Sequence, residues 1–261
     1  MLQTIRQTVA VAWMLAKRTL LAEARASRLS LLWPLIYPVA YTALFMALKP
    51  VMGGSARPAL VYALHVFIGL SLWQLWLQGL QGQMRSVKAQ RSLLSRADLS
   101  PSSLFLSGFL VEIVYLAPRL LLALVAAVLV LGFPGPVAVL VFLAMSVIVV
   151  LNGCVLGFVL QPFSTLMPDV AKAVQSVSLA LMVTGGIFVV FPADLNPSTV
   201  TLLSFNPLAP LVHAARSPLL GEPSLFGWAA MAWLAVTFAA LVLQARVARK
   251  VLPVLLERVG G

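Results

Sequence analysis

The sequence predicts an all-α integral membrane protein with six transmembrane helices and an N-terminal amphipathic helix. Of its 261 residues, 61% are apolar and 10% are charged, about half the charged share of an average soluble domain. Residues 120–168 contain no charged side chain, and this stretch is more than twice the roughly 20 residues that one helix needs to cross the hydrocarbon core. The apolar runs are continuous rather than alternating, which favours helices over barrel strands.

The first 30 residues are predicted to form an amphipathic interface helix along the cytoplasmic membrane surface rather than a cleavable signal peptide. Their basic side chains fall within about a third of the helical wheel, opposite an apolar face. Glu23 projects among the apolar residues, so we expect it to pair with a cation from another segment or to lie in a wet interfacial position. The basic residues are Arg6, Lys17, Arg18, Arg25 and Arg28, and the apolar face holds Leu2, Val9, Trp13, Ala16 and Leu20.

Six apolar runs of spanning length follow this helix. A Gly-Phe-Pro-Gly-Pro sequence at residues 132–136 cannot remain helical and predicts a tight external turn between the third and fourth runs. Residues 31–191 hold spans one to five, residues 225–243 hold span six, and residues 244–261 form a cytoplasmic tail. The runs are Leu31–Leu48, Leu60–Leu80, Leu104–Leu131, Pro136–Leu160, Ala173–Phe191 and Leu225–Leu243.

The positions of Lys and Arg predict that both termini lie in the cytoplasm. With that orientation, 14 of the 18 basic residues fall on the cytoplasmic side, three (Lys49, Arg57 and Arg216) fall outside, and Arg119 remains within span three. Membrane topology therefore explains the net charge of +11 better than a nucleic-acid partner does, and we expect no nucleic-acid partner.

The segment Pro192–Ser224, between spans five and six, is apolar but irregular. Residues 195–215 are uncharged, and Pro197, Pro207 and Pro210 interrupt them, so the segment is not expected to span. We expect it either to enter the membrane as short helices shielded by protein or to pack over the external face. A packed loop without a functional role is the alternative.

The residues give no sign of catalytic or energising machinery. A Gly-rich phosphate loop followed by Lys and Ser or Thr is absent, so we expect no nucleotide to bind in that way. His65 and His213 lie far apart in the sequence without a nearby carboxylate, which argues against a metal centre, and the lone Cys154 is expected to serve packing. We therefore predict a transport permease rather than an enzyme, with no cofactor bound by this chain.

Glu112 and Arg119 are the ionisable residues of span three. They lie on one helical face, but about 10 Å apart along the axis, which is too far for a good direct contact. We expect Glu112 at the level of the cytoplasmic headgroups, with Arg119 extending toward it. A role for both residues in an ion-coupled transporter or a membrane enzyme is the alternative.

The loop between spans two and three, Gln81–Ser103, is basic and lies on the predicted cytoplasmic side. It is predicted to form a short helix that ends at Ser100 and Pro101. A permease without its own energy source suggests a separate ATPase, and this loop is a candidate docking element; anchoring to anionic headgroups explains the composition equally well. The basic residues of the loop are Arg85, Lys88, Arg91 and Arg96.

Four stretches carry a family resemblance. They are Leu31–Pro38 (LLWPLIYP) at the start of span one, Gly69–Gln74 (GLSLWQ) in span two, Met167–Val170 before span five, and a closing signature of Phe191-Pro192, Asn206-Pro207-Leu208, Arg216 and Leu219–Gly221. Over nearly the whole chain they resemble the type-2 ABC transporter permeases that export O-antigen, capsular polysaccharide and teichoic acid. Pro168 stands where that family usually has Arg.

The resemblance implies a half-transporter in the bacterial inner membrane that forms a homodimer and pairs with two copies of an ABC ATPase. The dimer would pass a lipid-linked or lipid-attached glycan through its centre, while ATP and Mg²⁺ bind to the ATPase. Periplasmic export components are further partners that the resemblance leaves open. The loop after span two is similar in place to the family's coupling helix, and Pro192–Ser224 to its pair of short periplasmic gate helices. The implied coupling residues are Glu23, Arg25, Arg85, Lys88, Arg91 and Arg96, and the implied gate residues are Asn206, Pro207 and Arg216.

Trp33, Tyr37, Tyr41 and Phe45 recur every four residues along span one and form a stripe about 18 Å long. Aromatic rings stack on the apolar faces of sugar rings without fixing a charge, which suits a polymer that slides. Helix packing explains the stripe slightly better on its own. With the resemblance, we expect the stripe to line the substrate channel. The candidates opposite it, in span five, are Phe188 and Phe191.

Two other functions remain open. One is an exporter of the same architecture that moves small hydrophobic drugs or lipids. The other is the ion-coupled transporter or membrane enzyme that would use Glu112 and Arg119.

Overall fold

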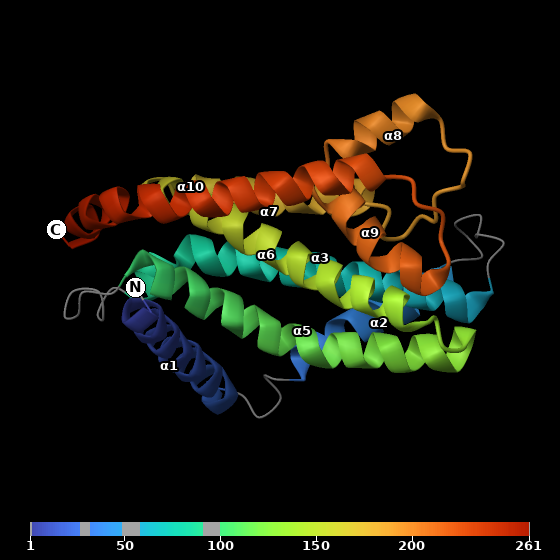
Figure 1. Cartoon of the computed structure of the whole chain (residues 1–261), viewed down its shortest axis with the longest axis horizontal. Helices are drawn as coiled ribbons and strands as arrows, with labels where there is room; N and C mark the ends of the chain where they lie inside the picture. Colours follow the sequence, from blue (N-terminus) through green and yellow to red (C-terminus); the bar gives the residue numbers. More distant parts are fainter. Residues whose placement is uncertain (1, 27–31, 49–57, 91–99, 261) are drawn as a thin grey trace.

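The computed structural model describes residues 2–26, 32–48, 58–90 and 100–260, and these residues form nine helices and no strands. Figure 1 shows the long helices running alongside one another, with both ends of the chain at the same end of the bundle and α8 and α9 at the other. The helices are α1 (Leu2–Ala26), α2 (Trp33–Leu48), α3 (Ala59–Ala89), α5 (Pro101–Leu131), α6 (Pro136–Leu166), α7 (Asp169–Thr184), α8 (Pro197–Ser204), α9 (Leu208–Leu220) and α10 (Gly227–Gly260).

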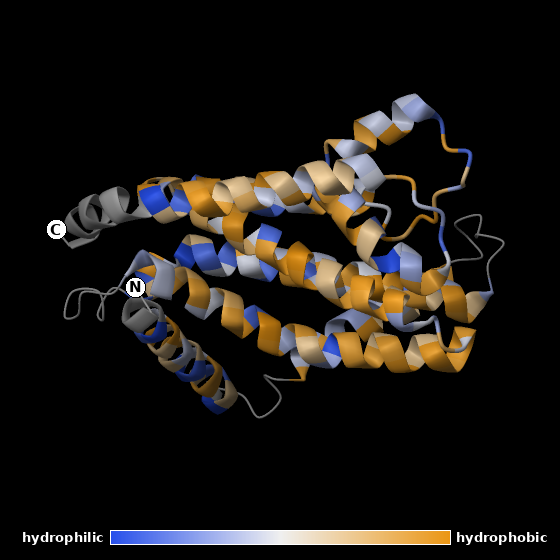
Figure 2. Cartoon of the chain, viewed as in Figure 1, coloured by the Kyte–Doolittle hydropathy of each residue, from blue (hydrophilic) through white to orange (hydrophobic). Residues whose placement is uncertain are grey.

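Four of these helices are long and apolar enough to cross a membrane, and α2 is a shorter apolar helix. The four are α3, α5, α6 and the Gly227–Val247 part of α10. Figure 2 shows their middle parts coloured mostly as hydrophobic, whereas hydrophilic residues gather on α1 and at the end of α3 near it. The prediction of an all-α, multi-pass membrane protein agrees with this arrangement.

Helix α3 lies at the centre of the bundle because small residues let α6 approach it closely. Gly153 and Gly157 of α6 face the backbone of Trp76 and Leu80, and a Cβ at either glycine would overlap the carbonyl oxygen opposite it. Gly79 of α3 faces α6 in return, where a Cβ would lie 2.8 Å from the Sγ of Cys154. Close backbone packing at small residues is how helices associate in a membrane, where lipid removes the hydrophobic driving force. The packing role predicted for the cysteine fits this position.

The boundaries of two predicted spans differ from the structure. Span two was predicted to end at Leu80, but α3 continues to Ala89, so Arg85 and Lys88 lie on its last turns and not on a separate loop helix. Ser100 and Pro101 begin α5 rather than end a helix, because the Ser100 Oγ accepts the backbone N–H of Ser103 at 3.2 Å. Arg91 and Arg96 lie outside the described residues.

The fifth predicted span, Ala173–Phe191, extends seven residues beyond the helix in the structure, because α7 ends at Thr184. The reason is Gly186, whose φ of 66° lies in the left-handed region that only glycine adopts without cost. A Cβ at this position would also overlap the ring of Phe191. Phe188 and Phe191 therefore lie beyond the helix, in the segment that leads to α8.

Helix α1 packs obliquely against α5 through Ala12, Leu15 and Ala16, which are buried. A helix forms here as predicted, and of its predicted apolar face Ala16 is buried whereas Val9 and Trp13 are exposed. This exposed apolar flank suits a helix at a membrane surface.

The segment between α7 and α10 contains two short helices, α8 and α9. Helix α8 is largely exposed, and so are its residue Leu202 and Phe205, which directly follows the helix. Helix α9 is almost entirely buried against α6, α10 and α3, so its apolar residues are shielded by protein. The predicted turn at residues 132–136 separates α5 from α6, and α10 continues helically through the predicted tail.

Candidate functional site

The aromatic stripe of α2 lies on a face that the chain leaves open. Trp33, Tyr37 and Tyr41 are 42%, 50% and 46% exposed, because α2 packs chiefly against α3 on its other side. The rings of Trp33 and Tyr37 stack with centroids 5.4 Å apart. Neither phenol hydroxyl of Tyr37 and Tyr41 hydrogen-bonds to a described residue. Packing against the other described helices of this chain leaves these three aromatic side chains about half exposed.

The far end of the stripe meets the segment after α7. Phe45 and Phe188 stack with centroids 3.8 Å apart, and the Tyr62 hydroxyl donates to the Phe188 carbonyl oxygen at 3.0 Å. Phe191 instead packs edge-on against Phe226 of the segment before α10, 5.8 Å between centroids. The structure thus brings one of the two predicted partners, Phe188, to the stripe and directs the other away from it.

A cavity of about 590 Å³ opens at the near end of the stripe, between α1, α2, α3 and α5. Trp33 and Tyr37 line it together with Glu23 of α1, Arg85 of α3 and Glu112 of α5. The sequence assigned these residues to three separate roles, in the channel, in ATPase coupling and in an ion-coupled transporter. The structure places all of them around one space.

One prediction for Glu23 was an ion pair with a cation from another segment. Among the described residues, Glu23 forms no such pair. It accepts a hydrogen bond from the hydroxyl of Tyr115 on α5, and this bond ties the end of α1 to the bundle. Arg25, the other predicted coupling residue of α1, is exposed. Lys88 is held by α6, since its Nζ donates to the Ser164 carbonyl oxygen at 3.3 Å.

Glu112 and Arg119 are buried among the helices, 8% and 1% exposed. The position of Glu112 at the level of the cytoplasmic headgroups stays a prediction. Arg119 donates from Nη1 to the carbonyl oxygen of Ser71 on α3 at 3.0 Å. No ion pair joins the two residues, as their spacing predicted, and the Glu112 Oε2 has no partner among the described residues. Both side chains lie inside the helix bundle.

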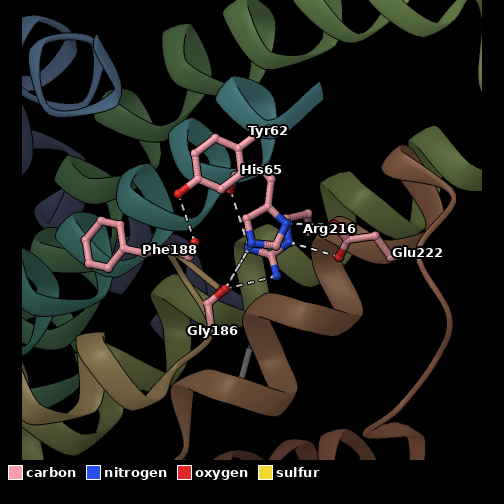
Figure 3. A network of polar contacts seen from close by, with 6 residues as sticks. All are labelled: Tyr62, His65, Gly186, Phe188, Arg216 and Glu222. Carbon is pink, nitrogen blue, oxygen red and sulfur yellow. Dashed lines mark hydrogen bonds and ion pairs between the residues drawn. The ribbon is translucent and has the colours of Figure 1, made fainter. Parts of the chain in front are cut away.

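A buried polar cluster joins α3, α9 and the segment after α7 at the opposite end of the bundle, and Figure 3 shows its side chains converging. The Arg216 Nε lies 3.2 Å from the Glu222 Oε2, and the His65 Nδ1 lies 2.7 Å from the Glu222 Oε1. Arg216 also donates from Nη2 to the Gly186 carbonyl oxygen at 3.2 Å, and the His65 Nε2 lies 3.1 Å from the same oxygen. The Glu222 carboxylate and the carbonyl oxygens of Gly186 and His65 therefore surround a buried guanidinium, and the first two also face the two ring nitrogens of His65.

Sequence reasoning missed this cluster. It placed His65 without a nearby carboxylate, which is wrong, because Glu222 is 157 residues away in the sequence and reaches it only in the fold. The available signal was Glu222 itself, which follows Arg216 by six residues in an otherwise uncharged segment. Within the described ranges, no three His, Cys, Asp or Glu side chains gather as a metal site would require.

Asn206 and Pro207, two of the predicted gate residues, stand where α8 gives way to α9. The Asn206 Nδ2 donates to the Leu181 carbonyl oxygen at 2.8 Å and to the Thr184 Oγ1 at 2.9 Å, while its Oδ1 accepts the Leu208 N–H at 2.8 Å. One side chain thereby starts α9 and fastens it to the end of α7. Pro207 directly precedes α9, and Arg216 lies in its third turn.

In a comparison with known protein families, residues 10–220 match the family described as ABC-2 type transporter. This range runs from within α1 to the end of α9. No curated protein matches the sequence.

Proposed function

Because the chain belongs to the ABC-2 type transporter family, whose membrane domain is a transport subunit without a catalytic domain, we propose that it exports a lipid-linked or lipid-attached polysaccharide. Permeases of this family pair with ABC ATPase subunits. ATP and Mg²⁺ would then bind to that subunit, and this chain would supply the path. Membership of the family does not identify the transported substrate, the formation of a homodimer or the orientation of the chain in the membrane, and these are the points that we propose.

The observation that carries the cargo proposal is the exposed aromatic stripe of α2. A helix that faced only lipid would bury its phenol hydroxyls at an interface or satisfy them inside the protein. The hydroxyl groups of Tyr37 and Tyr41 have no hydrogen-bond partner among the described residues, and both side chains are about half exposed. They therefore suit a water-filled channel that a second copy of the chain completes. Stacking on sugar rings gives contact without a fixed charge, and a long polymer can therefore move along it.

We propose six spans, with α2 and α7 added to the four long helices, and both termini in the cytoplasm. The excess of Lys and Arg on that side supports this orientation, as does the position of both chain ends at one end of the bundle. Helices α8 and α9 would then lie at the periplasmic end and act as the gate. The buried cluster of Arg216, Glu222 and His65 would be the joint that fixes α9 to the bundle.

The coupling surface would be the end of α1 and the last turns of α3, where Arg25 and Arg85 are exposed. Helix α1 begins, and α3 ends, near the end of the bundle that the proposal places in the cytoplasm. Movement of the ATPase would act directly on α1 and α3, and α3 contacts α2, α5 and α6. A displacement of α3 would therefore be transmitted to α2, which carries the aromatic stripe.

The test replaces Tyr37 and Tyr41 with Ala in the native cell and measures surface glycan as monosaccharides released by acid. We expect a loss of at least tenfold with normal amounts of the permease in the membrane. Phe238→Ala is the matched control, because this exposed aromatic of α10 lies on another helix and should leave export unchanged. Unchanged glycan with altered sensitivity to hydrophobic drugs would contradict the proposal and favour a small-molecule or lipid exporter of the same fold.

A further inference from the structure

We propose that the cavity between α1, α2, α3 and α5 is a sugar-binding site within each subunit, where the substrate is held before it enters the channel. This inference rests on the proposed function, because it assigns the cavity to the same glycan. It goes further in naming Glu112 and Glu23 as acceptors for sugar hydroxyls. The family match and the aromatic stripe do not assign a sugar-binding role to either residue.

Glu112 is the residue that most strongly indicates a ligand in this cavity. Its side chain is 8% exposed, it lines the cavity of about 590 Å³, and its Oε2 has no hydrogen-bond partner among the described residues. A buried carboxylate without a partner is costly, so such groups are rare in membrane helices unless they are used. Arg119, the basic residue of the same helix, donates only its Nη1 to the Ser71 carbonyl oxygen and forms no ion pair with Glu112; its Nε and Nη2 have no partner among the described residues.

Glu23 supplies a second carboxylate from a different element. Tyr115 donates its hydroxyl to the Glu23 Oε2, which holds this side chain at the cavity wall. Glu23 and Glu112 also line a neighbouring cavity of about 240 Å³. The two carboxylates therefore face a shared region of space from α1 and α5.

The other lining groups decide which ligand fits. Arg85 and the amides of Gln78 and Gln81 add hydrogen-bond donors to the two carboxylates, and Trp33 and Tyr37 add an aromatic wall. The guanidinium disfavours a simple organic cation, and the two carboxylates disfavour a simple anion. Sugar hydroxyls both donate and accept, and the apolar face of a sugar ring stacks on an aromatic wall. A neutral sugar therefore uses every group present, and the volume lies within the range of about 300–1,000 Å³ typical of ligand pockets.

Binding of three trisaccharides tests the inference: neutral maltotriose, cationic chitotriose with free amines, and anionic trigalacturonate, each radiolabelled and added to the full-length chain in lipid nanodiscs. We expect maltotriose to bind more tightly than the other two. Glu112→Gln should weaken this binding about tenfold, because it replaces an acceptor oxygen at the cavity wall with an NH₂ group that can only donate. Asp169→Asn, which removes an exposed carboxylate of α7, should leave it unchanged.

Thermal unfolding separates a binding role from a structural one. Because Glu112 is buried without a partner, Glu112→Gln should leave the melting temperature unchanged or raise it. A lower melting temperature, equal maltotriose binding by the Glu112→Gln variant and the unmodified chain, no binding of any probe, or tighter binding of chitotriose would each overturn the inference.

Surface glycan of cells carrying Glu112→Gln or Tyr41→Ala distinguishes this inference from the proposed function, since Tyr41 does not line the cavity. Loss of export with both variants supports both ideas. Loss of export with Tyr41→Ala together with normal export with Glu112→Gln overturns the sugar-binding site but agrees with the proposed polysaccharide permease. Normal export with both variants overturns both.

Discussion

Arg216 and Glu222 form an ion pair of 3.2 Å whose side chains are 1% and 3% exposed. The pair closes a short loop around the end of α9, and His65 binds the other carboxylate oxygen from α3. Removing one partner of such a buried ion pair is costly, because the remaining charge is buried without either its partner or hydrating water. Three segments that are distant in the sequence are thereby fixed at one end of the bundle.

Replacing Glu222 with Gln should lower the free energy of unfolding by about 3–5 kcal/mol, since the change leaves Arg216 charged and buried without a carboxylate. The measurement is thermal or denaturant unfolding of the purified chain in detergent. Asp169→Asn breaks an exposed pair with Lys172 and should have little effect. Equal stability of the two variants would show that the buried cluster does not hold α9 in place.

Replacing Gly157 with Ala should destabilise the chain by about 1–3 kcal/mol, because the added methyl group would overlap the Leu80 carbonyl oxygen and push α6 away from α3. Gly82→Ala is the matched control: a Cβ there has no neighbour within 4 Å, and Ala is the better helix former. We expect the melting temperature in detergent to fall for the first variant and to stay level or rise for the second. The opposite order would contradict the close α3–α6 packing.

Replacing Gly186 with Ala should also destabilise the chain, by two separate effects. The backbone would be strained at a φ of 66°, and the new Cβ would overlap the Phe191 ring. Phe191→Ala removes the overlap but leaves the strain, so the double variant should lose less stability than the two single changes added together. A double-variant cycle on melting temperature measures this coupling, and simple additivity would mean that the ring does not lie against this glycine.

Hydropathy predicted the four long helices well because each is a long apolar run, as in α5 and α6. It did not predict where α3 ends, because hydropathy reports contact with lipid whereas Gln81–Ala89 remain helical after the apolar run stops. The end of α7 depends on the backbone at Gly186, which no apolar pattern reports.

The candidate site was predictable only in pieces. The four-residue spacing of Trp33, Tyr37 and Tyr41 predicted a common helical face, and these side chains do share an open face. The cavity is made by α1, α2, α3 and α5, so no single segment shows that Glu23, Arg85 and Glu112 meet there. The environment of a buried ionisable group depends on the fold and not on neighbours in the sequence, so the spacing of Glu112 and Arg119 predicted that they do not pair but not that both are buried.

The most direct test of the whole account is purification of the tagged chain from native membranes in mild detergent, followed by assays of ATP hydrolysis and of glycan uptake into vesicles. We predict that an ABC ATPase co-purifies in equal amount, that a lipid-linked glycan accompanies the complex, and that vesicles accumulate this glycan only when the ATPase and ATP are both present. Vesicles that contain the chain alone and still move the glycan against its gradient would contradict the account.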